Sequence, residues 1–221
     1  MIQRTLRILV VEDQPLFKQM LDVLITSVPN FELVASVDRA SAAGLIDARS
    51  IDVALLDLGL PDGDGISLGR RLRADNPRMG VVLLSASNNM HALLELPYAE
   101  TAGWSYLSKL SCLSAAHLVR ALRRSAAGES VLDPELVQQR EFHDHGPLAS
   151  LTPRQRQVVA LVAEGLTNTA IAAELGLSRK SVDAHLNMAY TVLGIHSDGH
   201  RNPRVEVVRV FLRHTSHQAV S

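Results

Sequence analysis

A regular alternation of short apolar runs with stretches of helical period constrains the first half of the sequence more than any other feature. The apolar runs, rich in β-branched residues, are 7–11, 31–37, 53–57, 81–85 and 104–107. Amphipathic stretches such as 15–28 and 66–75 lie between them. Strands that alternate with helices favour βαβ units, and near-continuous apolar strands suit a parallel sheet covered on both faces. We therefore expect residues 1–128 to form a doubly wound, flavodoxin-like α/β domain with a five-stranded parallel sheet.

From residue 150 onward the pattern is helical, with clear helix start signals. Thr152, Pro153 and Gln155 suit a capping box with proline at the first helical position. Four helices are predicted, at 153–164, 168–175, 179–193 and 203–213. The second and third are joined by ELGLS, which is the layout of a helix-turn-helix whose second helix enters the major groove of DNA. The pattern predicts an all-α domain over residues 150–214.

Two segments lie outside these predicted domains. Residues 129–149 follow Gly128 and are expected to be an interdomain linker, with a short helical piece at 134–141 and then a polar Gly-Pro stretch. Residues 215–221 are expected to form an untethered tail. Two domains suit a chain of 221 residues.

Composition excludes several classes of protein. A content of 47% hydrophobic and 20% charged residues is that of an ordinary globular protein, and no apolar run approaches the about 18 to 20 residues of a membrane span. The first residues turn acidic after one short apolar run, so we expect no signal peptide. The single Cys112 excludes an internal disulfide framework and suits a reducing cytoplasm. Residues 150–221 carry eight Lys or Arg against five Asp or Glu, and this weakly basic part suits a partner that carries phosphates.

Polar residues follow the predicted strands at the edge where an open α/β sheet binds its ligands. They are three acids, one hydroxyl and one lysine: Glu12, Asp13, Asp57, Ser85 and Lys109. Clustered carboxylates repel one another, but Mg²⁺, which prefers oxygen ligands, would offset this repulsion when bound among them. Asp57 can then attack a phosphoryl group, while Lys109 and Ser85 bind the transferred oxygens. The sequence predicts a phosphate-accepting aspartate with Mg²⁺ as its cofactor.

Two other interpretations of these acids are weaker. Most Asp and Glu side chains simply solvate loops, an explanation that suits each acid alone better than the whole cluster. A dehalogenase-type phosphatase also uses an aspartate at a strand end, but it needs a second aspartate where this chain has Gly59. A nucleotide-binding G-x-x-x-x-G-K-[ST] stretch is also missing from the sequence. We therefore expect a protein that is not an enzyme and has no catalytic residues.

Residues 5–128 resemble the receiver domain of two-component response regulators. The resemblance rests on VVED (10–13), DLGLPDGDG (57–65), SAS (85–87) and YLSK (106–109). It implies that Asp57 is the phosphoacceptor. The implied Mg²⁺ ligands are Asp13, Asp57 and the Gly59 carbonyl, with Glu12 assisting through water. The implied partners of the phosphate are Lys109, which pairs with it, and Ser85 and Tyr106, which rearrange around it. AGW at 102–104 is shifted from the family's usual order and leaves these residues intact.

Residues 151–195 resemble the DNA-binding domain of the NarL/LuxR regulators. The resemblance rests on LTPRQRQV, EGLTN, IAAELGLS, SVDAH and LGI. A receiver followed by this domain is the NarL/FixJ arrangement of response regulators. It implies a cytoplasmic regulator of transcription with a sensor histidine kinase and double-stranded DNA as partners, and no membrane segment. It also implies a homodimer, for which relatives use the last helix.

The third helix of this domain departs from its family. Its buried stripe is expected to be Val182, Leu186, Ala189 and Leu193. Its DNA-facing residues are expected to be Arg179, Lys180, Asp183, Ala184, His185, Asn187 and Thr191. Relatives tend to carry Lys or Arg at the positions of Asp183 and Val192. Asn187 can read adenine, and phosphate contacts are expected from Arg156, Arg179, Lys180, Arg201 and Arg204.

Two functional interpretations stay open. In the first, the helical domain binds DNA with an altered or weakened sequence preference. In the second, the regulator works without phosphorylation, and its helical domain docks a protein partner or needs one to hold DNA. The pairs His143/His145 and His196/His200 also suggest a metal, but no cysteine accompanies them and Asp198-Gly199 interrupts the second pair. A solvated loop is the favoured interpretation of these histidines.

Overall fold

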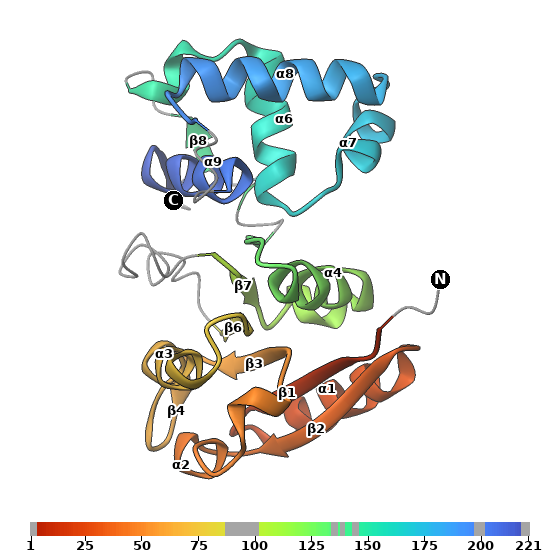
Figure 1. Ribbon diagram of the computed structural model, residues 1–221, viewed down its shortest axis with the longest axis vertical. Helices are drawn as coiled ribbons and strands as arrows, with labels where there is room; N and C mark the ends of the chain where they lie inside the picture. Colours follow the sequence, from red (N-terminus) through yellow and green to blue (C-terminus); the bar gives the residue numbers. More distant parts are fainter. Residues whose placement is uncertain are drawn as a thin grey trace. The chain divides into compact units, whose positions relative to one another are not determined.

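The computed structural model describes residues 4–86, 102–133, 137, 140–142, 146–196 and 202–217. The chain divides into two compact units (Figure 1). Of the described residues, those from 4 to 86 and from 103 to 129 form the first unit, and those from 130 to 217 belong to the second.

The first unit is built on a five-stranded parallel sheet. Its strands are β1 (Leu6–Val11), β2 (Phe31–Val37), β3 (Val53–Asp57), β6 (Gly80–Ser85) and β7 (Trp104–Ser108), in the order β2-β1-β3-β6-β7. Every residue of β3, β6 and β7 is buried, which explains why these strands are near-continuous apolar runs. The strand order is that of flavodoxin-like sheets, so the predicted fold class is confirmed.

Three helices of the first unit pack on the sheet, and each follows one of its strands in the sequence. They are α1 (Pro15–Ser27), which contacts β1 and β2; α3 (Gly65–Asp75), which contacts β3 and β6; and α4 (Ala115–Ala126), which contacts β3, β6 and β7. The segment between β2 and β3 holds only α2 (Ala40–Ala43) and the short 3-10 turn Ala48–Ser50. Another 3-10 turn, Ser111–Leu113, precedes α4.

Trp104, the only tryptophan of the chain, anchors α3 to the sheet. It is the first residue of β7 and is 1% exposed. Gly69 of α3 lies directly on its ring, because a Cβ added at Gly69 would be 2.6 Å from the Trp104 Cη2 atom. The Arg73 guanidinium lies 6.0 Å from the ring centroid. A larger residue at position 69 would therefore push α3 away from the sheet.

The second unit is helical. It contains the 3-10 turn Pro147–Ser150 and the helices α6 (Pro153–Ala163), α7 (Asn168–Leu175), α8 (Arg179–Val192) and α9 (Pro203–Arg213). The capping box of Thr152 and Gln155 is present, and Thr167 and Ser178 cap α7 and α8 through their side chains. The predicted helix-turn-helix is confirmed. Among the helices of the described ranges, none has both the length and the apolar character needed to cross a bilayer.

Two expectations at the borders of this unit are wrong. Arg140–Phe142 forms strand β8, which pairs antiparallel with β9 at Thr215–His217. The last two residues of the expected helical piece at 134–141 therefore lie in a strand, and most of that piece lies outside the described residues. The pairing also holds residues 215–217, which were expected to be untethered. Within the expected linker, Val131 and Leu132 are buried, and the Leu132 amide donates to the Ala163 carbonyl at 2.8 Å. The apolar residues of a polar-looking segment complete the helical core, which composition alone does not reveal.

Candidate functional site

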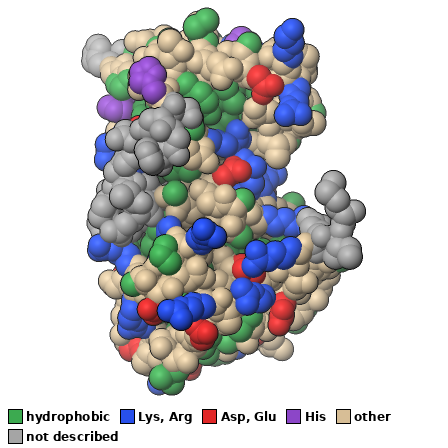
Figure 2. All heavy atoms as spheres, in the orientation of Figure 1, with side chains coloured by type: hydrophobic (Ala, Val, Ile, Leu, Met, Phe, Trp, Pro, Cys, Tyr) green, Lys and Arg blue, Asp and Glu red, His purple; other side chains and the backbone are tan. Residues whose placement is uncertain are grey.

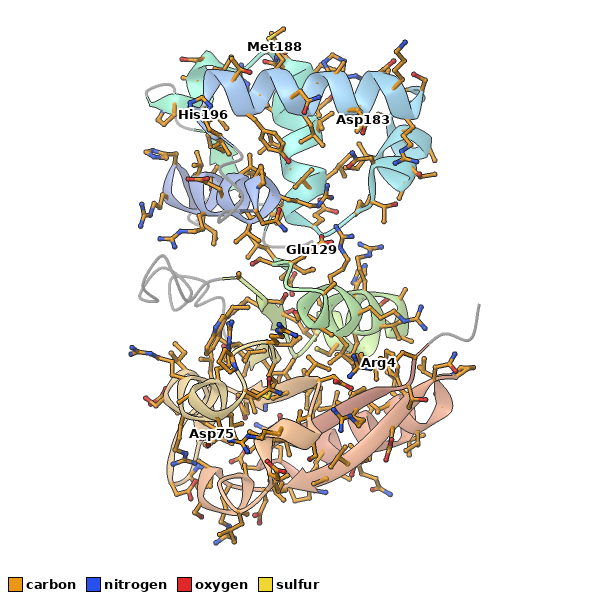
Figure 3. All side chains as sticks on the ribbon, viewed as in Figure 1. Arg4, Asp75, Glu129, Asp183, Met188 and His196 are labelled. Atoms are coloured by element: carbon orange, nitrogen blue, oxygen red, sulfur yellow. The ribbon has the colours of Figure 1, made fainter. Side chains whose placement is uncertain are left out.

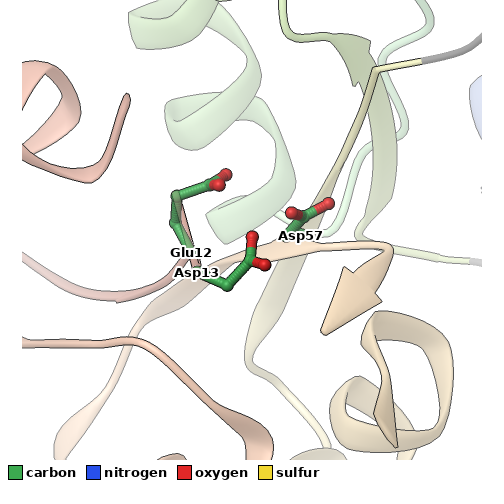
Figure 4. Close-up of side chains that lie close together, drawn as sticks. All are labelled: Glu12, Asp13 and Asp57. Atoms are coloured by element: carbon green, nitrogen blue, oxygen red, sulfur yellow. The ribbon is translucent and has the colours of Figure 1, made fainter. Parts of the chain in front are cut away.

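The predicted acids meet at the carboxyl edge of the sheet. Glu12 and Asp13 directly follow β1, and Asp57 ends the neighbouring strand β3. A carboxylate oxygen from each of the three lies within 4.8 Å of the others (Figure 4). Strand order reverses direction between β1 and β3, which is where open α/β sheets place their ligand site.

Lys109, which follows β7, reaches across the sheet edge to two of these acids. Its Nζ donates to the Glu12 Oε1 at 2.7 Å and to the Asp57 Oδ2 at 2.9 Å. Its backbone amide donates to the Ser85 carbonyl at 2.8 Å, which fixes the start of the loop beside β6. The lysine therefore bridges the carboxylates that end β3 and follow β1.

Burial and hydrogen bonds set the charges of this cluster. Burial raises the pKa of the Glu12 carboxyl, although the hydrogen bond from Lys109 acts in the opposite direction. Burial disfavours the charged form of Lys109, but its hydrogen bonds to Glu12 and Asp57 outweigh this and raise its pKa. Lys109 is therefore a permanent cation at neutral pH.

The loop after Asp57 is held against this residue by two glycines. The Gly59 amide donates to the Asp57 Oδ1 at 3.2 Å. Gly59–Leu60 (β4) pairs with Gly63–Asp64 (β5) in a small hairpin. Gly65 begins α3, where an added Cβ would lie 2.4 Å from the Asp57 carbonyl oxygen. Glycine at position 65 therefore allows α3 to begin directly beside Asp57.

Asp62, between β4 and β5, joins the loop after Asp57 to α2. Its carboxylate accepts from the Ala40 amide at 2.7 Å and from the Ser41 amide at 2.9 Å. Hydrogen bonds from Ser41, through side chain and backbone, and from Ala40 lower the pKa of Asp62 to about 2. Arg71 of α3 donates to the Ala40 carbonyl at 3.0 Å. Sequence reasoning assigned Asp62 only to the loop, because the four residues of α2 are too few to show a helical pattern.

Ser85 and Tyr106 occupy different places. Ser85 ends β6 and lines a hollow of about 340 Å³ over the acidic site. The hollow is lined by Asp13, Gln14, Asp57, Leu58, Gly59, Ser85, Ala86 and Lys109. Tyr106 is fully buried within β7 and is not among these lining residues. The structure thus brings together Asp57, Asp13, Gly59, Ser85 and Lys109 around one hollow, while Tyr106 lies deeper.

The donor set fits a hard divalent cation. Three carboxylates face one lysine, so the cluster keeps an excess of negative charge. The Glu12 Oε2 atom is buried and has no hydrogen-bond partner among the described residues, an arrangement that a cation or its water would satisfy. Carboxylate oxygens of Asp13 and Asp57 and the carbonyl of Gly59 are the ligand types that Mg²⁺ selects.

Helix α8 presents most of the predicted DNA-facing residues to solvent. Arg179, Lys180, Ala184, Asn187 and Thr191 are exposed, whereas His185 is half-buried. Val182, Leu186 and Ala189 form the buried stripe as expected. Leu193 is only half-buried, because it caps the helix beyond its last turn, so its expected place in the stripe is wrong. Figure 2 shows Lys and Arg side chains around the N-terminal end of α8.

The Asp183 carboxylate, which was expected to face DNA, accepts a hydrogen bond from another helix of the second unit. Its Oδ1 atom accepts from the Asn168 Nδ2 at 2.6 Å, and the carboxylate is half-buried (Figure 3). Asn168 Oδ1 in turn accepts from Arg204 at 3.0 Å, and Arg204 also donates to the Leu166 carbonyl. The three side chains join α7, α8 and α9.

One expectation about phosphate contacts changes in consequence, and another stays untested. Arg204 is engaged by Asn168 and Leu166, so the prediction that it serves phosphates is weakened. Arg201 lies outside the described residues, as do His143, His145 and His200. Sequence reasoning missed Asn168, whose only signal is its place as the first residue of α7, where a polar side chain commonly serves a helix end.

Comparison with known proteins gives two family matches. Residues 8–123 match the response regulator receiver domain, and residues 149–201 match the luxR family of bacterial regulatory proteins. A nitrate/nitrite response regulator protein homolog of Haemophilus influenzae is 30% identical over 199 residues, covering 89% of this chain and 94% of the relative. The DNA-binding transcriptional activator DevR/DosR of Mycobacterium tuberculosis is 29% identical over 198 residues, covering 86% and 88%. A solved LuxR-family response regulator from Aurantimonas sp. SI85-9A1 is 27% identical with a TM-score of 0.53, covering 61% of this chain and 94% of that chain.

Proposed function

Because the chain belongs to the NarL/FixJ-type two-component response regulators, which control transcription, we propose that phosphorylation of Asp57 by a sensor histidine kinase controls its binding to DNA. The observation that carries this proposal is the bridge from Lys109 to Glu12 and Asp57 beside the other carboxylates. We assign the receiver domain to residues 1–128, the linker to 129–149 and the DNA-binding domain to 150–214.

The transfer step uses the carboxylate of Asp57 as nucleophile. One of its oxygens forms a bond to the phosphorus of a phosphohistidine on the kinase, and the P–N bond breaks. The electron pair of that bond stays on the imidazole, which takes up a proton, and Asp57 becomes an acyl phosphate. The Lys109 ammonium, which already donates to Oδ2, would pair with the added negative charge. Ser85 lines the space that the phosphate would enter, so its hydroxyl would bind a phosphate oxygen.

Mg²⁺ would be held by Asp13, Asp57 and the Gly59 carbonyl, with Glu12 acting through water, and it would neutralise charge on the phosphoryl oxygens. The orphaned Glu12 Oε2 supports this assignment. Asp62 keeps the Gly59 hairpin attached to α2, so the protein part of the site is in place before phosphate arrives.

The phosphate would act as a switch on the sheet edge. Ser85 and Tyr106 would shift toward it, and the segment from 86 to 110, most of which lies outside the described residues, would change with them. This would favour a homodimer able to bind double-stranded DNA, which is a population shift. A protein with these two partners works in the cytoplasm, where its DNA is.

A selection of genomic fragments on the purified full-length protein tests this proposal. Fragments are selected in Mg²⁺, with and without beryllofluoride as an acyl-phosphate mimic. Enrichment of a shared two-fold motif in the presence of the mimic is the expected result. Equal enrichment in both arms would leave DNA binding in place and remove phosphate from the mechanism.

One observation favours a second function, in which the helical domain docks a protein partner without phosphorylation. Met188 and Val192 of α8 are 57% and 42% exposed, and apolar side chains at a surface suit protein contacts. Absence of enrichment in both arms of the same selection would support this function.

A further inference from the structure

The exposed face of α8 carries an apolar line along its middle. Ala184, Met188 and Val192 are spaced four residues apart and are all exposed, so they lie along one face of the helix. Met188 projects away from the rest of the unit (Figure 3). Asn187 and Thr191 lie beside this line and are also exposed.

Positive charge is confined to one end of this helix. Arg179 and Lys180 occupy its first turn, and no Lys or Arg follows them up to Val192. Asp183, the only acid of α8, accepts a hydrogen bond at its Oδ1 atom from the Asn168 Nδ2 at 2.6 Å. His185 and Tyr190, the other titratable residues of α8, are half-buried.

This distribution determines which bases the helix can read. Guanine is read mainly by Arg or Lys at its O6 and N7 atoms, whereas thymine offers a methyl group and adenine a donor and acceptor that match an amide side chain. Past its first turn, the exposed side chains of α8 are the apolar line, one amide at Asn187 and one hydroxyl at Thr191, which can bond to any base. We infer that Ala184 and Met188 contact thymine methyl groups and that Asn187 pairs with adenine, so that each half-site is rich in A·T pairs beneath the middle of α8. The inference rests on the proposed function and specifies its DNA.

Charge complementarity favours DNA over a protein as the occupant of this face. The cations and the N-terminus of α8 lie together at one end, where a phosphate backbone would run. The apolar line is only three side chains long, and Asn187 and Thr191 border it on one side. A narrow apolar line beside polar side chains suits a row of methyl groups in the major groove better than the broad apolar core of a protein interface.

Deoxyuridine substitution tests the inference one methyl group at a time. The half-site is first found by selection with the phosphate mimic, and each thymine in it is then replaced by uracil, which removes only the 5-methyl group. Loss of one well-buried methyl group should weaken binding about fourfold, since burying such a group contributes about 0.8 kcal/mol. Met188→Ala should abolish this sensitivity at one position, whereas Met188→Leu should retain it. Asn187→Ala should reduce the preference for adenine at a neighbouring position by about fivefold or more.

The outcomes separate this inference from the function on which it rests. A motif whose central positions are G·C, or binding that ignores uracil at every position, would overturn the inference and leave phosphate-controlled DNA binding intact. Failure to bind any DNA with the mimic present would overturn both. Met188 is exposed, so its variants should keep the circular dichroism and melting temperature of the parent, which excludes misfolding as the cause of a negative result.

Discussion

The acidic site and the α8 face differ in how they hold their charged residues. The acidic site buries Glu12 and Asp57 and joins them through one lysine. On α8 the cations are exposed, and the only acid is bonded to another helix. A phosphorylation site requires fixed residue types at strand ends, whereas a DNA-reading face is free to change with the sequence it reads. This difference teaches that the first site can be identified by residue type and the second only by surface geometry.

The largest effect is expected from Asp57→Asn. An amide cannot form the acyl phosphate, so the variant should take up no phosphate from a small-molecule donor or from a kinase, as measured by intact-protein mass spectrometry. Asp47→Asn changes a similar charge on an exposed loop and should keep full uptake. Phosphate on the Asp57→Asn variant would show that the acceptor has been misplaced.

Gly65→Ala tests how closely the acceptor strand and α3 are packed. Its Cβ would lie 2.4 Å from the Asp57 carbonyl oxygen, so we expect a loss of about 1 to 3 kcal/mol in unfolding free energy from overpacking. The matched control is Gly59→Ala, since nothing lies within 4 Å of a Cβ there. Equal urea denaturation midpoints for the two variants would contradict the close approach.

Asp183→Ala tests whether this acid serves the fold or only opposes DNA. Removing it breaks a 2.6 Å hydrogen bond from Asn168, and bonds to charged groups contribute about 1.5 to 3 kcal/mol, so we expect a loss near the lower end for a half-buried pair. A double-mutant cycle with Asn168→Ala should give a coupling above about 0.5 kcal/mol. Zero coupling with tighter DNA binding would instead mean that Asp183 acts mainly as a charge opposed to phosphates.

Asp62→Asn should have the smallest effect, and one that depends on pH. Because the folded-state pKa of Asp62 is lowered to about 2, its charge contributes stability above the ordinary value near 3.8, and that contribution is lost as pH falls through about 2. Melting temperatures of the variant and the parent should differ slightly at pH 7 and converge below about pH 2. The pKa of Asp64, the N-cap of α3, is also lowered. The melting temperature of Asp64→Asn, compared with that of the parent, should therefore depend on pH with the same sign.

Sequence patterns predicted most of the fold because burial on both faces of a parallel sheet leaves continuous apolar runs. The strands at 31–37 and 53–57 and the helices at 168–175 and 203–213 have the bounds that were expected. Segments whose structure depends on distant partners escaped prediction. β8 and β9 are three residues each and pair across most of the helical unit, so neither carries a local signal.

The features of the candidate site also fall into two groups, those that the sequence identified and those that it did not. The acids and the lysine were identifiable because their place after a strand defines their position in space. The bonds of Asp62 to α2 and of Asp183 to Asn168 depend on side chains brought together by the fold, and no spacing in the sequence indicates them.

The packing of Trp104 against α3 gives the protein a built-in optical label. Since it is the only tryptophan, fluorescence excited at its absorption band comes from the sheet-containing unit alone. Its ring is enclosed beside Gly69 and Arg73, so unfolding of that unit should move the emission to longer wavelength. The helical unit is silent in this signal, whereas the far-ultraviolet dichroism reports the helices of both units. Comparing the two signals in one denaturation experiment therefore shows whether the two halves of the regulator unfold together, without any added dye.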